Sequence, residues 1–88
     1  MESMRLDKYL KVSRLIKRRT LAKEVADQGR ITINGAVAKA SSNVKTGDEL
    51  VIRLGQRITT LRVEQLQEST RKEDATQMFT ILKEEKIS

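Results

Sequence analysis

The chain has 88 residues, a formal net charge of +6, and neither cysteine nor histidine. Its length predicts one small domain with a modest core. The missing residue types exclude thiol nucleophiles, disulfides, Cys/His zinc sites and imidazole acid–base catalysis. No apolar run exceeds three residues, so we expect no signal peptide, no membrane span and a cytoplasmic location.

Two short helices are predicted in the first third of the chain. The first ends near Arg14, because the spacing i, i+3, i+4, i+7 of one helix face links Leu6, Tyr9, Leu10 and Ser13. The second runs from Arg18 to Gln28, and Gly29 follows where a helix-ending residue adopts positive φ. Its expected buried face consists of Leu21, Ala22, Val25 and Ala26. Leu15-Ile16 is expected to close the corner between the helices with apolar side chains.

After Gly29 the apolar period changes from helical spacing to two, which is typical of strands. Ile31 and Ile33 begin the pattern, and Asn34-Gly35 is the strongest short signal for a hairpin turn. Further strands are expected at 36–39, 49–54 and 57–63, with turns at 45–48 and 55–56. The four or five short strands predict a small, curled antiparallel sheet.

The C-terminal quarter predicts a third helix. Thr70 and Glu73 match the capping box T-x-x-E, and the helix is expected to contain Ala75, Met78, Phe79 and Leu82. Residues 64–88 hold six acids and four bases, and we expect the tail to be anchored on the scaffold through Met78, Phe79, Ile81 and Leu82. The predicted fold is therefore α+β, with a two-helix basic hairpin on the sheet. Residues 4–63 form the main domain and residues 64–88 a mildly acidic helical extension.

Residues 5–23 concentrate the positive charge of the chain. They hold eight basic side chains and one acid, Asp7, so that the remainder of the chain sums to −1. Solvated helix faces usually interleave acids for i, i+4 pairing, and this stretch does so only with Asp7. Repulsion among eight cations is best tolerated when a polyanion supplies the counter-charge. The stretch therefore indicates nucleic-acid binding, with a merely solvated face or an acidic protein partner as alternatives.

Catalysis is not indicated. Carboxylates such as Asp48 and Glu49 have ordinary surface explanations, because no glycine loop, metal cluster or nucleophile accompanies them. We therefore expect a non-enzymatic protein without cofactor or metal. Asn34-Gly35 is more simply a hairpin turn than a binding loop.

Folded RNA is favoured over other nucleic acids. With one Tyr and one Phe, the chain has no aromatic platform for splayed bases. The expected outward side of the second helix (Glu24, Asp27, Gln28) is acidic or neutral, which does not suit a DNA major groove. Cations at a corner and at helix ends suit RNA gripped by its shape and phosphates.

Four motifs then resemble a known family. In order they are R-L-D-K-Y-L, S-R-L-I-K-R-R-T-L-A-K, G-R-I-T-I-N-G and G-D-E-L, and they resemble the RNA-binding domain of small-subunit ribosomal protein four over about residues 4–54. That family places two helices on a short twisted sheet and presents a basic surface to folded RNA. The stand-alone form resembles the bacterial fifteen-kilodalton heat-shock protein. The ending M-F-T-I-L-K-E-E-K and the stretch KVSRLIKRRTLAKEVADQGRI resemble the RqcP (YabO) family more closely.

This resemblance implies ribosome-associated quality control. RqcP-like proteins bind large ribosomal subunits obstructed by a peptidyl-tRNA, beside RqcH, and steady the tRNA during C-terminal alanine tailing. By motif position, Arg5 and Arg19 are the main expected contacts to rRNA. Contacts to rRNA or tRNA backbone are expected from Arg14, Lys17, Arg18 and Lys23. Lys8 and Lys11 are assigned only to the general field.

The partners implied are large-subunit rRNA, peptidyl-tRNA, the large ribosomal subunit and RqcH, with the protein acting as a monomer and binding no membrane. Two alternatives stay open at this point. One is a DNA-binding regulator of helix-turn-helix type, and the other is a general heat-shock protein that binds rRNA and tRNA.

Overall fold

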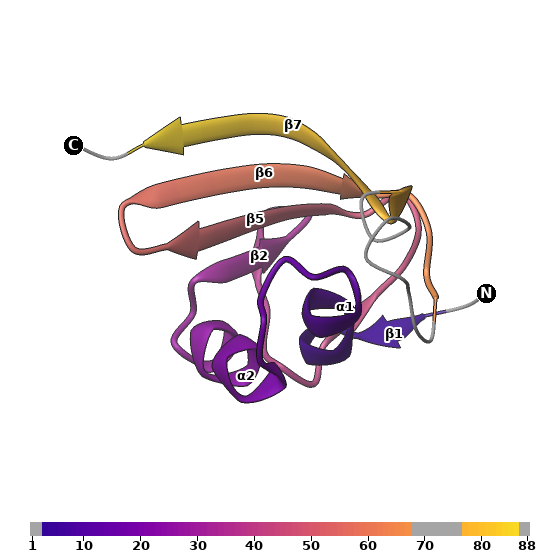
Figure 1. Cartoon of the computed structure of the whole chain (residues 1–88), viewed down its shortest axis with the longest axis horizontal. Helices are drawn as coiled ribbons and strands as arrows, with labels where there is room; N and C mark the ends of the chain where they lie inside the picture. Colours follow the sequence, from indigo (N-terminus) through magenta and orange to yellow (C-terminus); the bar gives the residue numbers. More distant parts are fainter. Residues whose placement is uncertain (1–2, 68–76, 87–88) are drawn as a thin grey trace.

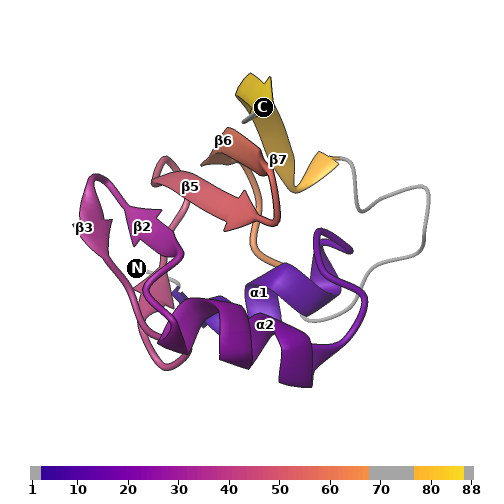
Figure 2. The ribbon, with the colours of Figure 1, turned by 90° about the vertical axis from the view of Figure 1, so that its left-hand side faces the viewer.

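The computed structural model describes residues 3–67 and 77–86. Within them, two helices form one layer and a curved antiparallel sheet forms the other (Figures 1 and 2). The helices are α1 (Leu6–Val12) and α2 (Arg19–Asp27). The strands are β1 (Met4–Arg5), β2 (Ile31–Ile33), β3 (Ala36–Val37), β4 (Asn43–Val44), β5 (Glu49–Leu54), β6 (Arg57–Val63) and β7 (Phe79–Lys86). The main sheet has the order β3-β2-β5-β6-β7, and β1 pairs separately with β4. The expected α+β class is confirmed.

Helix α1 buries the face that its spacing predicts. Its fully buried residues are Leu6, Tyr9 and Leu10. The helix ends at Val12, and the chain then turns sharply because Arg14 adopts a φ of 63°. The Ile16 amide donates to the Leu10 carbonyl at 3.1 Å, and the Ile16 side chain is buried. The apolar corner between the helices is therefore confirmed.

Helix α2 buries three of its four expected positions, namely Ala22, Val25 and Ala26. The prediction for Leu21 is wrong, because this side chain is 45% exposed. At 100° per residue, Leu21 lies roughly a quarter turn from the centre of the face formed by the other three. Gly29 ends the helix with a φ of 76°, as expected.

No helix in the described part of the chain is long and apolar enough to cross a membrane.

The Asn34-Gly35 turn joins β2 to β3 and has a structural role. Both residues have positive φ, 52° and 89°, which is the geometry of a tight hairpin turn. The Asn34 amide nitrogen donates to Asp48 Oδ1 at 3.1 Å, and the Glu49 backbone N–H donates to Asn34 Oδ1 at 2.9 Å. This side chain therefore locks the hairpin to the turn that precedes β5. Strands β5 and β6 have the bounds that the sequence predicts.

The short ladder between β1 and β4 is not predicted by the sequence, because two-residue strands carry no readable pattern. Met4 pairs with Val44 and Arg5 with Asn43. The next two amides, of Leu6 and Asp7, donate to the carbonyls of Ser42 and Ala40 at 2.7 and 3.2 Å. These bonds satisfy first-turn N–H groups that have no partner inside α1. The ladder also fixes the backbone from which the Arg5 side chain projects.

The C-terminal helix prediction is wrong for residues 79–86, which form strand β7. This strand pairs antiparallel with β6 along its length, from Val63 opposite Phe79 to Arg57 opposite Lys86. Without β7, the outer edge of β6 would leave its backbone groups unpaired, and the ladder satisfies them. The β-branched and aromatic run Phe79-Thr80-Ile81 suits a strand as well as a helix. The proposed capping residues Thr70 and Glu73 lie outside the described residues.

The tail is anchored less extensively than the sequence suggests. Met78 is fully buried and Phe79 is partly buried against the core. The expectation for Ile81 and Leu82 is wrong, since they are 43% and 45% exposed. A register shift between Thr60 and Leu61 leaves Leu82 out of the ladder, as in a β-bulge. Strand β7 is the outermost strand of the sheet (Figure 1). It thus carries exposed apolar side chains.

Tyr9 fastens α1 to the start of β7. The phenol is fully buried, and its O–H donates to the Met78 carbonyl at 2.8 Å. Burial raises the pKa of the Tyr9 phenol well above its ordinary value of 10.0, and the negative charge of Glu64 raises it further. The unfolded chain therefore loses this proton first as pH rises. The stability that Tyr9 contributes is fully present below about pH 10 and is lost above it.

We expect the free energy of unfolding to fall with pH above about 10, and the tyrosinate absorbance to appear only as the protein unfolds. Tyr9 is the one tyrosine of the chain, so this absorbance reports it alone. Urea titrations at several alkaline pH values measure the slope, and Tyr9→Phe is the control because it removes the phenol but keeps the ring. A tyrosinate signal that titrates near pH 10 in the folded protein contradicts this prediction.

Candidate nucleic-acid interface

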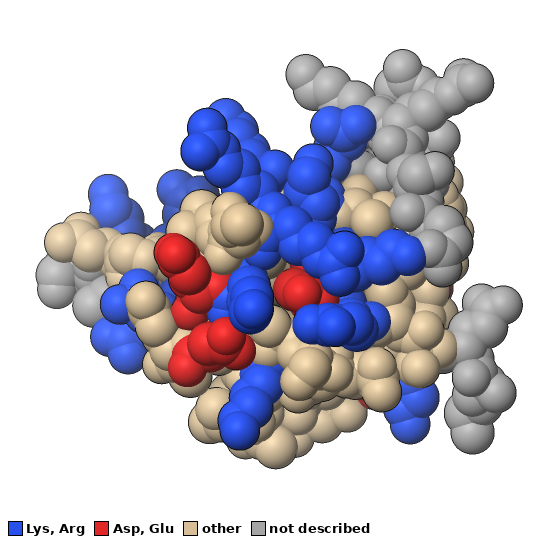
Figure 3. All heavy atoms as spheres, turned by 90° about the horizontal axis from the view of Figure 1, so that it is seen from below, with Lys and Arg blue, Asp and Glu red and all other residues tan. Residues whose placement is uncertain are grey.

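Basic side chains gather on the side of the molecule formed by α1, α2 and the corner between them (Figure 3). All six predicted contact residues are exposed, namely Arg5, Arg14, Lys17, Arg18, Arg19 and Lys23. Lys11 is exposed as well, and Lys8 is half-buried. The fold therefore gathers the basic stretch of sequence onto one face, called here the helical face, on which basic side chains predominate and a few acidic ones lie among them. Contact of these residues with RNA stays a prediction.

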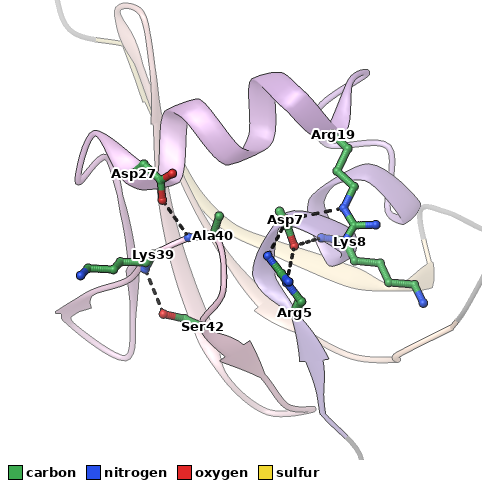
Figure 4. A network of polar contacts seen from close by, with 8 residues as sticks. All are labelled: Arg5, Asp7, Lys8, Arg19, Asp27, Lys39, Ala40 and Ser42. Atoms are coloured by element: carbon green, nitrogen blue, oxygen red, sulfur yellow. Dashed lines mark hydrogen bonds and ion pairs between the residues drawn. The ribbon is translucent and has the colours of Figure 1, made fainter.

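A carboxylate joins the two arginines that the resemblance ranks first (Figure 4). Arg5 contacts Asp7 through two nitrogens, with Nε 3.3 Å from Oδ1 and Nη2 3.3 Å from Oδ2. Arg19 Nε lies 3.5 Å from Asp7 Oδ2. The backbone N–H of Lys8 donates to Oδ1 at 2.8 Å. Arg5 comes from β1, Arg19 opens α2, and Asp7 lies in the first turn of α1.

Burial makes this arrangement rigid. The Asp7 side chain is 4% exposed, whereas those of Arg5 and Arg19 are each 51% exposed. A buried carboxylate is tolerated only when charges and hydrogen bonds satisfy its oxygens, and here two guanidinium groups and a backbone N–H do so. Each arginine has five N–H donors in a fixed fork, so both keep donors toward solvent. The two guanidinium groups, called here the arginine pair, are thus oriented before any ligand binds.

Arg14 and Lys17 lie away from the arginine pair, at the corner between the helices. With Lys11 and Ile16 they line a hollow of about 380 Å³. The positive φ of Arg14 is what turns the chain at this point. Arg18 occupies the position before the first residue of α2, and Lys23 follows Arg19 by one helical turn. The six predicted residues therefore fall into the arginine pair, a corner group (Arg14 and Lys17), Arg18 just before α2 and Lys23 on α2.

Two features of the site are missed by reasoning from sequence. In the sequence, Asp7 is only the single acid of the basic stretch, and its ion pair with Arg19 becomes visible only when α1 and α2 are in contact. Lys11 is assigned to the general field, and the structure brings it beside Arg14 and Lys17. The signals were the single acid among eight cations and the spacing of three residues between Lys11, Arg14 and Lys17.

A family model, that of the S4 domain, matches residues 4–50. A protein of Bacillus subtilis called RQC P-site tRNA stabilizing factor is 70% identical over 84 residues, which are 96% of this chain and 98% of that protein. The chain is a member of the S4 domain family, in its branch of RQC P-site tRNA stabilizing factors. The resemblance to the RqcP family is thereby confirmed.

Two further similar proteins extend the comparison. The factor of the same name from Streptococcus pneumoniae is 54% identical over 96% of this chain and 96% of its own length. Heat shock protein 15 of Vibrio cholerae, whose solved structure is described as trimeric, is 32% identical and superposes with a TM-score of 0.84 over 91% of this chain and 82% of that protein. The S4 match covers α1, α2 and the strands up to the start of β5, so the arginine pair and the corner group belong to the S4 part of the chain.

Proposed function

We propose that this protein is a non-enzymatic RNA-binding factor of ribosome-associated quality control. It binds large ribosomal subunits obstructed by a peptidyl-tRNA and stabilises the tRNA there by contacts to rRNA and tRNA. The observation that carries the proposal is the arginine pair, because two arginines held by one buried carboxylate on an exposed basic face form a preorganised anion site. A factor named for stabilising P-site tRNA is 70% identical to this chain over nearly its full length, and this similarity supports the same choice of ligand.

The physical mode of binding follows from rigidity. Each free arginine side chain carries about 2 kcal/mol of rotamer entropy, and part of this is already lost in the pair. The helical face therefore suits an RNA of fixed shape better than a flexible strand. Phosphate contacts from Arg14, Lys17, Arg18 and Lys23 would set the position on that shape.

On the ribosome, this positioning supports RqcH-dependent addition of C-terminal alanine to the stalled chain. The protein supplies contacts and no chemistry, and it acts in the cytoplasm as one copy on each subunit. A general heat-shock role predicts a different result, because such a role does not involve alanine tailing. Cells that lack this protein are therefore expected to lose alanine tails on stalled chains, which mass spectrometry of those chains measures. Tails of normal length would favour the heat-shock role.

The electrostatic part of the proposal predicts a steep salt dependence. If six to eight phosphates are neutralised, log affinity falls against log salt with a slope between about −4 and −7. Sucrose-gradient sedimentation with large subunits carrying peptidyl-tRNA, at several salt concentrations, measures this slope. An affinity that does not change with salt concentration would contradict the electrostatic part of the proposal.

Competition separates RNA from DNA. Helix α2 carries Glu24 and Asp27, both exposed, and two carboxylates disfavour its entry into a DNA major groove. Excess tRNA is expected to displace the protein from subunits more effectively than duplex DNA of equal charge. A preference for one duplex sequence, together with a dimer in solution, would instead support a DNA-binding regulator.

A further inference from the structure

A groove of about 280 Å³, called here the sheet groove, lies where the corner between the helices meets the sheet. Its apolar lining comes from the corner, β5 and β7, and consists of Leu15, Ile52, Leu54, Phe79 and Ile81. Its polar lining consists of Arg57, Thr59 and Glu84. Ile52 is only 3% exposed, whereas Ile81 is 43% exposed. The sheet groove therefore has a closed apolar floor and a rim that a ligand can reach.

The sheet groove borders the basic corner of the helical face. Leu15 lines the sheet groove, and the next two residues, Ile16 and Lys17, line the corner hollow. Two residues of chain span at most about 7 Å, so the two depressions lie on either side of one short backbone segment. An RNA strand whose phosphates contact the corner therefore passes the mouth of the sheet groove.

The sheet groove also holds the one aromatic ring that a ligand can reach. The chain has one Tyr and one Phe, and Tyr9 is fully buried with its O–H bonded to the Met78 carbonyl. Phe79 is only partly buried, and it lines the sheet groove. Unpaired bases of RNA stack on aromatic side chains and on arginine guanidinium planes. One ring suits one base and does not provide a platform for several in succession.

The polar end of the sheet groove can contact the edge of a base. Arg57 Nη1 lies 3.2 Å from Glu84 Oε1, and the two side chains are 66% and 48% exposed. A guanidinium has five N–H donors and a carboxylate has two oxygens, so this pair keeps donors and an acceptor for a ligand. Thr59 adds a hydroxyl. The edge of a base carries donors and acceptors together, whereas an apolar side chain of a protein partner carries neither.

We propose that the sheet groove binds one unpaired nucleobase of the RNA held by the helical face. Its volume lies just below the range of roughly 300–1,000 Å³ of pockets for drug-sized ligands, which fits one base and not a stacked run. The base lies against Phe79 and Ile81, with its edge toward Arg57 and Glu84. This inference rests on the proposed function and adds recognition of an unstacked base to the phosphate contacts.

The first test is the affinity of Ile81→Asp, in the full chain, for large subunits that carry peptidyl-tRNA. The variant puts a carboxylate at the rim of the sheet groove, and sedimentation is expected to show binding at least about fivefold weaker, the lower end of what one lost stacked base costs. Phe79→Leu keeps an apolar side chain but removes the ring, and a loss of at least about the same size is expected. Urea unfolding of both variants checks that the fold is kept.

Leu82→Asp is the matched control. Leu82 is the next residue of β7, is 45% exposed and does not line the sheet groove. The substitution changes the net charge by the same amount as Ile81→Asp, and we expect it to weaken binding only slightly. Ile81→Asp and Leu82→Asp should melt at similar temperatures, because both side chains are about equally exposed. An equal loss of affinity in the two variants would overturn the proposal.

Photocrosslinking identifies what enters the sheet groove. A diazirine analogue of leucine is placed at position 81, and in a second preparation at position 82, and each protein is irradiated on the obstructed subunits. From position 81 we expect crosslinks to one unpaired nucleotide, at a higher yield than from position 82. Crosslinks from position 81 to a protein would overturn the nucleobase and identify the sheet groove as a site for an apolar side chain of a protein partner.

Failure of this inference can be told apart from failure of the proposed function. If Ile81→Asp and Phe79→Leu bind the subunits normally while Arg19→Ala does not, the base site is wrong and the RNA-binding factor stands. If the unaltered protein does not bind the subunits, both are wrong.

Discussion

Arg19→Ala and Arg5→Ala, each made alone, are expected to reduce affinity for obstructed large subunits by at least about tenfold. A hydrogen bond to a charged group contributes ~1.5–3 kcal/mol, and the lower end of that range corresponds to this factor. Each single variant leaves Asp7 with the other arginine and with the Lys8 N–H. The free energy of unfolding should therefore change by less than about 1 kcal/mol, as for a half-exposed ion pair. Sedimentation with subunits measures the first quantity and urea unfolding the second.

Arg53→Ala is the matched control, because Arg53 is an exposed arginine on β5, in the sheet layer. It lowers the net charge equally and should weaken binding only slightly. Arg19→Lys keeps the charge but loses the planar fork, so an intermediate affinity is expected. If Arg53→Ala costs as much as Arg19→Ala, net charge governs binding and the arginine pair has no special role.

The double variant Arg5→Ala/Arg19→Ala is a poorer test. It leaves the Asp7 carboxylate, which is 4% exposed in the folded protein, without either guanidinium. Such a group costs about 1–3 kcal/mol when its partners are removed. A loss of binding would then mix a lost contact with partial unfolding. This distinction follows from the structure and is not visible in the sequence.

The fold could be predicted wherever a local pattern matches the final environment. Leu6, Tyr9 and Leu10 repeat with helical spacing, and the core buries that face. Asn34-Gly35 fixes its hairpin through backbone conformations that few other residue pairs adopt. In each of these places, local propensity and tertiary packing favour the same structure, so the sequence is sufficient.

Prediction failed where a distant segment decides the outcome. Residues 79–86 satisfy a helical spacing about as well as a strand pattern, and the open edge of β6 selects the strand. Leu21 lies at the margin of the α2 stripe, where burial depends on how closely α1 and the sheet approach. At the interface, the cations are visible in the sequence, but their grouping is set by contacts across twelve residues, as between Asp7 and Arg19.

A substitution of Asp7 best distinguishes the effect of arginine orientation on binding from the effect of net charge. Asp7→Asn raises the net charge from +6 to +7, so a purely electrostatic account predicts tighter binding to every polyanion. In the structure, the carboxylate holds the arginine pair, and the neutral amide cannot pair with both guanidinium groups. We therefore expect affinity for obstructed subunits to fall about tenfold, while affinity for flexible poly-uridylate stays equal or rises. The ratio of the two affinities is the quantity to measure.

Glu24→Gln is the matched control for Asp7→Asn, because Glu24 is an exposed acid of α2 and its removal raises the charge by the same amount. It should tighten binding to both ligands. In the Asp7→Asn background, Arg19→Ala should cost less than in the unaltered protein, since the arginine is no longer oriented. A destabilised fold would lower both affinities together, whereas a lost orientation lowers only that for the subunit. Tighter subunit binding by Asp7→Asn would show that the carboxylate only lowers the net positive charge. The orientation of the arginine pair would then have no role in binding.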